Sequence, residues 1–182
     1  GCSSLTSINV LNFDTTQVLY MNKMFANCNS LTSLDLSRFN TKLVTNFESM
    51  FNSCTKLVSI DFSSFSGENI LSAYQMFHNC KSLKYLKINQ FNTGSSLSKI
   101  NELFGNCSSL ESVDISRMDT RSVKEMKSVF EGCENLKQID LSSIDTHSVT
   151  TFENMFSGCS ALSSLDLSKF NTDFVTSTVG MF

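Results

Sequence analysis

Seven cysteines divide the chain into segments of nearly equal length. Successive cysteines are 26 residues apart, apart from one interval of 27 residues. Even spacing along a whole chain is typical of a tandem repeat rather than of a disulfide framework or a metal site. The column consists of Cys2, Cys28, Cys54, Cys80, Cys107, Cys133 and Cys159.

Apolar residues repeat in phase with the cysteines. A phenylalanine column contains Phe25, Phe51, Phe77, Phe104, Phe130, Phe156 and Phe182. A leucine column contains Leu5, Leu31, Leu57, Leu83, Leu110, Leu136 and Leu162. We therefore divide the chain into seven repeats, each of about 26 residues, which together make a single repeat domain.

Each repeat combines two periodicities. Apolar residues alternate with a polar one at Leu34, Asp35 and Leu36, which predicts a short strand with one buried face. The apolar residues from Val44 to Cys54 recur at steps of three and four, which predicts one face of a short helix. A unit of this length cannot bury so many apolar side chains alone, so we expect stacked units with parallel strands about 4.8 Å apart.

The repeat resembles that of a known family. Its L-x-x-L-x-L core is that of leucine-rich repeats, and the longer phrase M-F-x-N-C-x-S-L-x-x-L-D-L-S resembles the BspA-type leucine-rich-repeat surface proteins. The phrase is clearest at residues 24–31 and 155–162. Common leucine-rich repeats have a buried Asn three residues after the last strand Leu, whereas this chain has apolar residues there. An apolar stack should replace the Asn ladder at Phe13, Phe39, Phe65, Phe91, Met118, Ile144 and Phe170.

The expected fold class is α/β. We predict a right-handed leucine-rich-repeat solenoid spanning residues 1–182, with parallel strands on one face and short helices or helical turns on the other. Solenoids need polar caps at both ends. Because the sequence starts and stops inside the repeat motif, we expect it to be a fragment of a longer repeat array, or to have ends that something else covers.

Composition argues against several classes of function. The net charge is -3, which gives no electrostatic attraction toward nucleic acid. No apolar stretch approaches the roughly 18 residues that a membrane span needs. The two histidines, His78 and His147, lie in different columns, and no Gly-rich phosphate loop or metal-ligand cluster is present. We therefore expect no enzyme activity, no catalytic residue, no cofactor and no metal site.

The cysteines are predicted to be reduced and buried. Neighbouring side chains in a parallel stack point the same way, so their Cβ atoms stay too far apart for a disulfide. A ladder also diverges along its axis, whereas zinc needs four converging ligands. Buried Cys behaves as a small hydrophobic residue.

The outward position of the strand carries most of the candidate binding residues. An Asp occupies it in five repeats, and a Lys in the fourth. These carboxylates could form a binding stripe for a basic partner or a calcium site. Alternatively, each could bond to the Ser two residues on. Large and basic side chains anchor interfaces better than Ser and Thr, so Tyr85 joins the predicted strand-face site: Asp35, Asp61, Tyr85, Lys87, Asp114, Asp140 and Asp166.

Two functions fit this sequence. The first is a non-catalytic protein-binding module, and the resemblance implies a secreted or cell-surface protein that takes part in adhesion or contacts a host or neighbouring cell. Its partner would be an extracellular or cell-surface protein. The second is a structural protein whose repeats stack end to end into fibres or a surface layer, with self-association as its main interaction.

Overall fold

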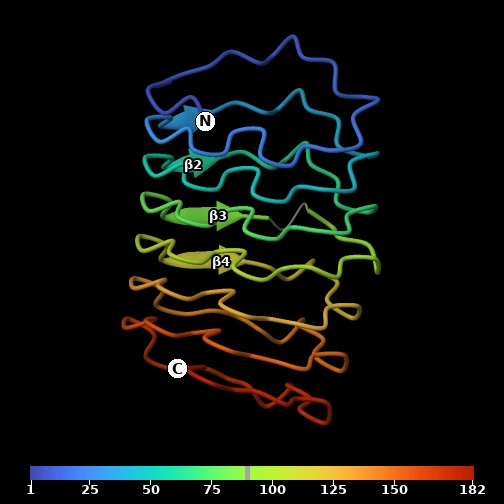
Figure 1. Cartoon of the computed structure of the whole chain (residues 1–182), viewed down its shortest axis with the longest axis vertical. Coiled ribbons are helices and arrows are strands. Elements are labelled where there is room, and N and C mark those ends of the chain that lie inside the picture. The colour runs from blue at the N-terminus through green and yellow to red at the C-terminus, as the bar shows by residue number, and fades with distance from the viewer. Residues whose placement is uncertain (89–90) are drawn as a thin grey trace.

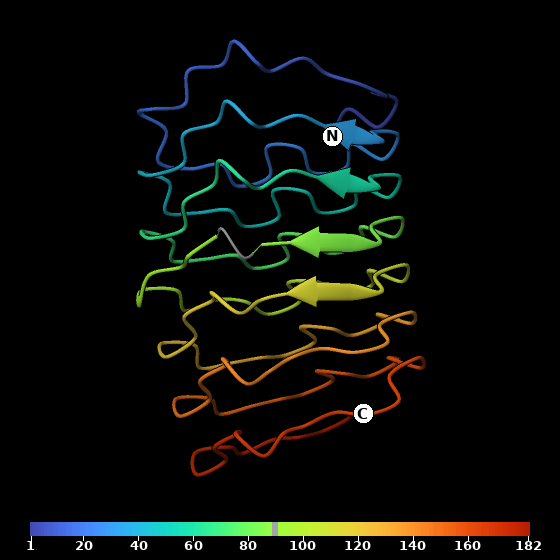
Figure 2. The ribbon, with the colours of Figure 1, turned by 180° about the vertical axis from the view of Figure 1, so that it is seen from behind.

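The chain winds into a stack of similar coils that ascend along one axis (Figure 1). The computed structural model describes residues 1–88 and 91–182, apart from the side chain of Lys87. The two termini lie at opposite ends of the stack, and each coil lies against the coils before and after it (Figures 1 and 2). Residues one repeat apart in the sequence are therefore neighbours in space, as the repeat predicts.

Four short strands occupy the same side of successive coils. They are β1 (Ser33–Leu34), β2 (Ser59–Ile60), β3 (Tyr85–Lys87) and β4 (Ser112–Asp114). β1 pairs with β2, and β3 pairs with β4, both in parallel and in the register of the repeat. The prediction of parallel strands on one face is confirmed.

The described residues contain no helix, so the short helices of the expected α/β class are not found, and of the two predicted alternatives only turns are present. The segment after each strand is instead a run of tight turns whose backbone bonds alternate. In the second repeat, the N–H groups of Phe47, Ser49 and Phe51 donate to the next coil at 2.8–3.0 Å. The N–H groups of Met50 and Asn52 donate three residues back at 3.1 Å.

Left-handed backbone conformations make this alternation possible. Lys23, Ser49, Gln75, Glu102, Ser128 and Asn154 form one column of non-glycine residues with φ between 53° and 60°. A second column contains Asn27, Ser53, Asn79, Asn106, Gly132 and Gly158, with φ between 58° and 76°. An α-helix has negative φ throughout. The two columns therefore interrupt any helix, although the apolar residues between them still face the core.

The core consists of ladders of identical side chains. The rings of the phenylalanine column stack on one another from Phe25 to Phe182, with centroids 5.4–6.3 Å apart and planes within 15°. Offset stacking at this distance is favourable beyond the area it buries. Phe39 and Phe65 are buried and stack at 6.4 Å, which confirms the predicted apolar stack at those positions.

All seven cysteines are free, and five are buried. Each Sγ from Cys54 to Cys159 lies 3.1–3.2 Å from the carbonyl oxygen of a phenylalanine in the preceding coil, and can donate to it. Burial raises the pKa of Cys54 to about 12 and that of Cys159 to about 11. The column therefore fills the core and satisfies backbone carbonyls. The exceptions to the predicted burial lie in the outermost coils, where Cys2 is exposed and Cys159 is partly exposed.

A ladder of threonines holds successive coils together at a turn that follows the strand position of each coil. The Thr120 hydroxyl donates to the carbonyl of Asp145 at 2.8 Å and accepts from its N–H at 2.9 Å. Thr15, Thr41 and Thr146 make the same pair of bonds to the next coil, and Thr93 accepts from Asp119 N–H at 2.7 Å. We call Thr15, Thr41, Thr93, Thr120 and Thr146 the threonine ladder. All five are at most 5% exposed.

Candidate binding surface

The strand-face carboxylates have a structural partner of their own. Each accepts a hydrogen bond at one oxygen from the backbone N–H two residues on, at 2.8–3.0 Å. The pairs are Asp35 with Ser37, Asp61 with Ser63, Asp114 with Ser116, Asp140 with Ser142, and Asp166 with Ser168. These Asx-turns reverse the chain as it leaves the strand. The bond to the Ser two residues on is therefore formed, while partner binding by these carboxylates stays a prediction.

The serines also lower the pKa of three carboxylates in this row. Hydrogen bonds from Ser37 and Ser142 lower the pKa of Asp35 and Asp140 below the usual 3.8. Hydrogen bonds from Ser168 lower that of Asp166 in the same way. A hydrogen bond to the charged form favours ionisation. The three carboxylates are thus negative at neutral pH and remain on the exposed side of the strands.

The fourth repeat presents a different surface. Tyr85 in β3 is 58% exposed, and Val58, one residue before β2, is 48% exposed. In the next two coils, Glu111 forms an ion pair with Lys137, with Nζ and Oε2 2.6 Å apart. Hydrogen bonding from Lys137 is the main cause of the lowered pKa of Glu111, and Tyr85 and Lys84 contribute. We call Val58, Lys84, Tyr85, Glu111 and Lys137 the Tyr85 patch.

Lys87 has a defined backbone only. It pairs with Asp114 in the parallel register of β3 and β4, which places it in the same column as the strand-face carboxylates. Its side chain lies outside the described part of the structure, so the predicted role of Lys87 stays a prediction. Beside this pair, the surface between the fifth and sixth repeats has an open hollow of about 560 Å³, lined by Ser112, Asp114, Ser116, Gln138 and Asp140 among others.

A second polar surface, on the turn side, was not found from the sequence. The Glu102 carboxylate accepts from Gln75 Nε2 at 2.8 Å and from the Tyr74 hydroxyl at 3.4 Å. The His78 Nδ1 lies 3.2 Å from the same carboxylate. Gly105 makes room for the imidazole, because a Cβ there would lie 2.8 Å from Nδ1. The sequence signal for these contacts is that Gln75 and His78 occupy nearly the same positions in their repeat as Glu102 does in the next one.

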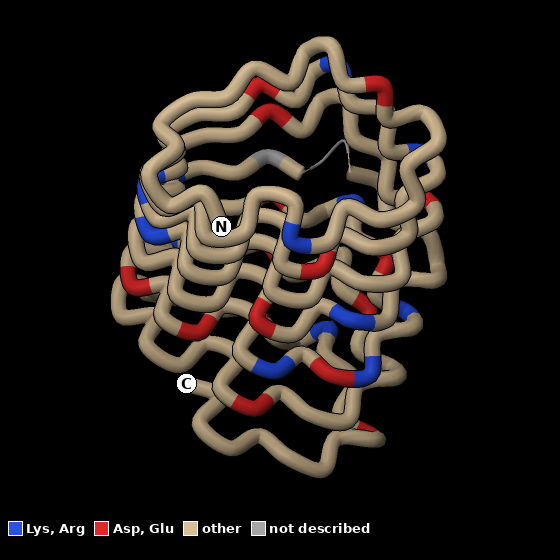
Figure 3. Tube along the Cα trace, turned by 45° about the horizontal axis from the view of Figure 1, so that its top comes forward, with Lys and Arg blue, Asp and Glu red and all other residues tan. Residues whose placement is uncertain are grey.

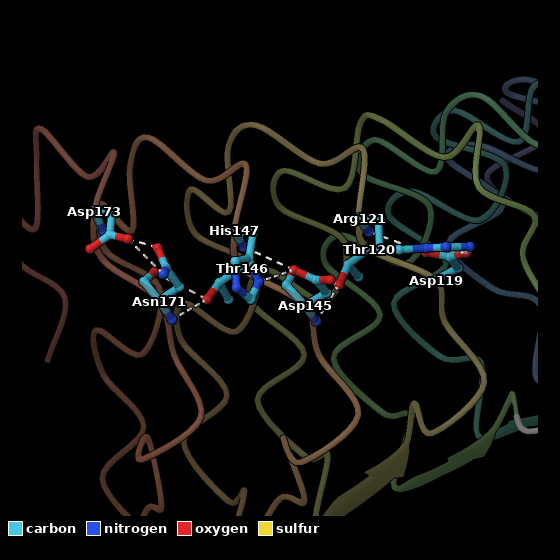
Figure 4. Close-up of polar contacts among 8 residues, drawn as sticks. All are labelled: Asp119, Thr120, Arg121, Asp145, Thr146, His147, Asn171 and Asp173. Atoms are coloured by element: carbon cyan, nitrogen blue, oxygen red, sulfur yellow. Dashed lines mark hydrogen bonds and ion pairs between the residues drawn. The ribbon is translucent and has the colours of Figure 1, made fainter.

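The corner at the threonine ladder carries exposed charges (Figure 4). Arg121 pairs with Asp119 at 2.6 Å, and His147 Nδ1 lies 2.9 Å from Asp145 Oδ1. Asp119, Asp145 and Asn171 each also accept from the backbone N–H two residues on. These are again Asx-turns. Asn40 accepts from Lys42 N–H in the same way, so this residue also shapes a turn.

Neither histidine is placed for catalysis next to a nucleophile. His78 and His147 each face a carboxylate, as above, and the buried thiols have raised pKa values. Across residues 1–88 and 91–182, no group of three or more His, Cys, Asp or Glu residues is arranged to hold a metal ion. Nor does this part of the chain contain a helix of the length and apolarity that a membrane span requires.

The sequence was compared with models of known protein families. A family model described as "Mycoplasma protein of unknown function, DUF285" matches residues 1–113 and 97–182, which together cover the whole sequence. The chain belongs to the DUF285 family. Membership in the BspA-type family, which the sequence motif suggests, stays a prediction. No curated protein sequence matches the chain.

Three solved structures show a limited likeness. The T. pallidum leucine-rich-repeat protein TpLRR is 22% identical, with a TM-score of 0.48 over 82% of this chain and 74% of that one. A leucine-rich-repeat protein from Bacteroides ovatus is 20% identical, with a TM-score of 0.46 over 80% and 40%. A leucine-rich cell surface protein from Faecalibacterium prausnitzii is 20% identical, with a TM-score of 0.36 over 88% and 61%. At these scores the likeness carries no argument. The solenoid rests on the hydrogen bonds described above.

Proposed function

We propose that this chain is a non-catalytic protein-binding module that contacts its partner through the strand face. The observation that carries the proposal is the Tyr85 patch, where a 58% exposed tyrosine stands in a column otherwise rich in Ser, beside a 48% exposed valine. Tyr is favoured at interface hot spots because it combines a large contact area with a hydrogen-bonding end. The regular rows of Asp35, Asp61, Asp114 and Asp140 flank the patch.

The resemblance to BspA-type proteins supports an extracellular or cell-surface location, and a role in adhesion or in contact with a host or neighbouring cell. A rigid stack of coils suits that role, because its side chains are pre-organised before a partner arrives. Figure 3 shows that charged residues recur along the coils, with acidic and basic residues interspersed. Such a mixed surface favours a specific protein partner over non-specific attraction to a polyanion.

The test is affinity capture with the immobilised chain from extracellular matrix and cell-surface extracts, followed by identification of the retained protein. Tyr85→Ala combined with Lys87→Ala should abolish capture of that protein. The control variant is Glu48→Ala on the turn side, which should retain it. If capture survives the strand-face changes and is lost with Glu48→Ala, the opposite surface is the binding site and the proposal is wrong.

A second candidate function is end-to-end stacking with a second copy of the chain. It is favoured by the parallel register of the coils and by the stacked phenylalanine rings, which a second copy could continue. Sedimentation velocity over a range of concentrations tests this function. A particle that lengthens with concentration supports stacking, and Phe182→Lys should prevent it. A sedimentation coefficient independent of concentration argues against it.

A further inference from the structure

The strand face carries one local excess of positive charge. Lys56, Lys81 and Lys84 are exposed and lie at the approach to β2 and β3. None of the three takes part in the ion pairs that the described residues form, whereas Lys127 and Lys137 are both paired. The whole chain has a net charge of -3, so the positive charge is local to these two coils.

The lysines adjoin the exposed apolar part of the Tyr85 patch. Lys84 is the residue before Tyr85, Lys56 lies two residues before Val58, and β2 contacts β3. The Lys84 carbonyl accepts a backbone bond at 2.9 Å from Glu111, which continues the column into the next coil. An aromatic side chain, an aliphatic side chain and three lysines therefore belong to two adjacent coils, on the strands or just before them.

Acidic residues adjoin this surface. Asp61 in the coil of β2 and Asp114 in β4 are exposed, and Glu111 lies beside Lys84 in the next coil. Stacked coils are about 4.8 Å apart, so a long polyanion laid along the stack would meet these carboxylates after a short distance. Like-charge contacts of this kind disfavour a wrong partner. A short acidic segment can reach the lysines without meeting them.

We propose that the partner presents a short acidic protein segment with an aromatic or aliphatic side chain at its centre. Its carboxylates bind Lys81 and Lys84, with Lys56 adding to the positive field, and its apolar side chain packs on Tyr85 and Val58. This inference rests on the proposed function, because it names the chemistry of the protein that the strand face binds. It differs from the sequence-based expectation of a basic partner, which considered the Asp row alone.

The experiment is an NMR titration of the isotope-labelled chain with a synthetic peptide in which Glu residues flank a central Tyr-Leu pair. The control peptide has Gln in place of every Glu. We expect amide signals at residues 56–58 and 81–85 to shift with the acidic peptide, and the Gln peptide to bind about tenfold more weakly. Lys81→Gln combined with Lys84→Gln should weaken the acidic peptide by about the same factor. Lys42→Gln with Lys124→Gln, exposed lysines away from the strands, should leave the affinity unchanged.

Three outcomes would overturn the inference. The first is an absence of shifts at millimolar peptide, and the second is shifts confined to the turn side. The third is a sulfated polysaccharide, used as competitor, that binds this surface more tightly than the acidic peptide. If Tyr85→Ala still abolishes capture of the cellular partner while the peptide leaves every signal unmoved, the proposed function holds and only the acidic chemistry is wrong.

Discussion

Replacing Thr120 with Val should destabilise the fold by removing two hydrogen bonds from the middle of the threonine ladder. The hydroxyl is within a side chain that is 1% exposed, and it bonds to both the carbonyl and the N–H of Asp145, at 2.8 and 2.9 Å. Val has a similar shape but no hydroxyl. A buried hydrogen bond contributes a net 0.5–1.5 kcal/mol, so two contribute roughly 1–3 kcal/mol, and the orphaned N–H adds to the loss. For a chain of this size, 1 kcal/mol shifts the melting temperature by about 2–4 °C.

The assay is thermal and urea denaturation followed by circular dichroism. Thr120→Ser keeps the hydroxyl and removes one methyl group, so it should lose only about 0.8 kcal/mol. Thr32→Val is the matched control, because Thr32 is exposed and a surface change usually stays within about 0.5 kcal/mol. If Thr120→Val is as stable as the natural chain, or if Thr120→Ser is the less stable of the two, the ladder does not hold the coils as argued.

Two further predictions concern titratable groups. In native protein treated with a thiol reagent near pH 8, Cys2 should react rapidly and Cys159 more slowly, while the five buried cysteines should react only after denaturation, which brings the total to seven. Burial raises the pKa of Cys80, Cys107 and Cys133, which suppresses the reactive thiolate form. Rapid reaction of Cys107 in the native protein would contradict the buried column. Asp35, Asp140 and Asp166 should make a constant contribution to stability above the usual carboxyl pKa of 3.8, and that contribution should be lost as the pH falls through their lowered pKa values, because a folded-state pKa below the unfolded one stabilises only the ionised form. Replacing all three with Asn should make the acid limb of a melting-temperature profile shallower, and an unchanged limb would assign it to other groups.

The core and the stacking direction could be predicted from the sequence. The columns of Phe, Cys and Leu fix which residues are one coil apart, and a parallel stack follows because identical side chains must meet. The same columns predict burial correctly from Leu31 to Phe156, since every buried ladder position has an apolar residue above and below it.

The conformation of the turn side could not be predicted by the same reasoning. Steps of three and four residues place Val44, Phe47, Met50 and Cys54 on one face of a helix, but the observed turns bury the same four side chains. The turns differ from a helix in the partner of the backbone N–H, which lies in the next coil. Hydrophobic periodicity carries no information about that partner. The threonine ladder was missed for a similar reason. Each Thr bonds to a residue of the next coil, and hydrophobic periodicity carries no information on such a bond. Gly67 interrupts the ladder because a Cβ there would approach the Phe91 ring at 3.0 Å.

The exposure of Tyr85 could be predicted, whereas its role in binding stays a proposal. The departure of the fourth repeat from its neighbours indicated Tyr85, because a repeat shows at once which exposed position is unusual. The ion pair between Glu111 and Lys137 needed the structure, since the two residues belong to different repeats and a repeat-by-repeat comparison treats each as an isolated substitution. The same limit hid the contact between His78 and Glu102.

The difference between turn and helix can be measured at Ser128. This residue has a φ of 54° and lies between the buried Met126 and Phe130. In a helix, Gly would be less stable than Ala by about 0.5–1 kcal/mol because of its greater backbone entropy. In the left-handed conformation, the Cβ of Ala costs about 1–2 kcal/mol that Gly avoids, so Ser128→Gly should be the more stable of the two variants. Glu131, which is outside the positive-φ columns, supplies the control, and there Ala should be more stable than Gly. Urea denaturation of the four variants gives both differences. An Ala variant more stable than Gly at Ser128 would favour a helix and refute the alternating turns.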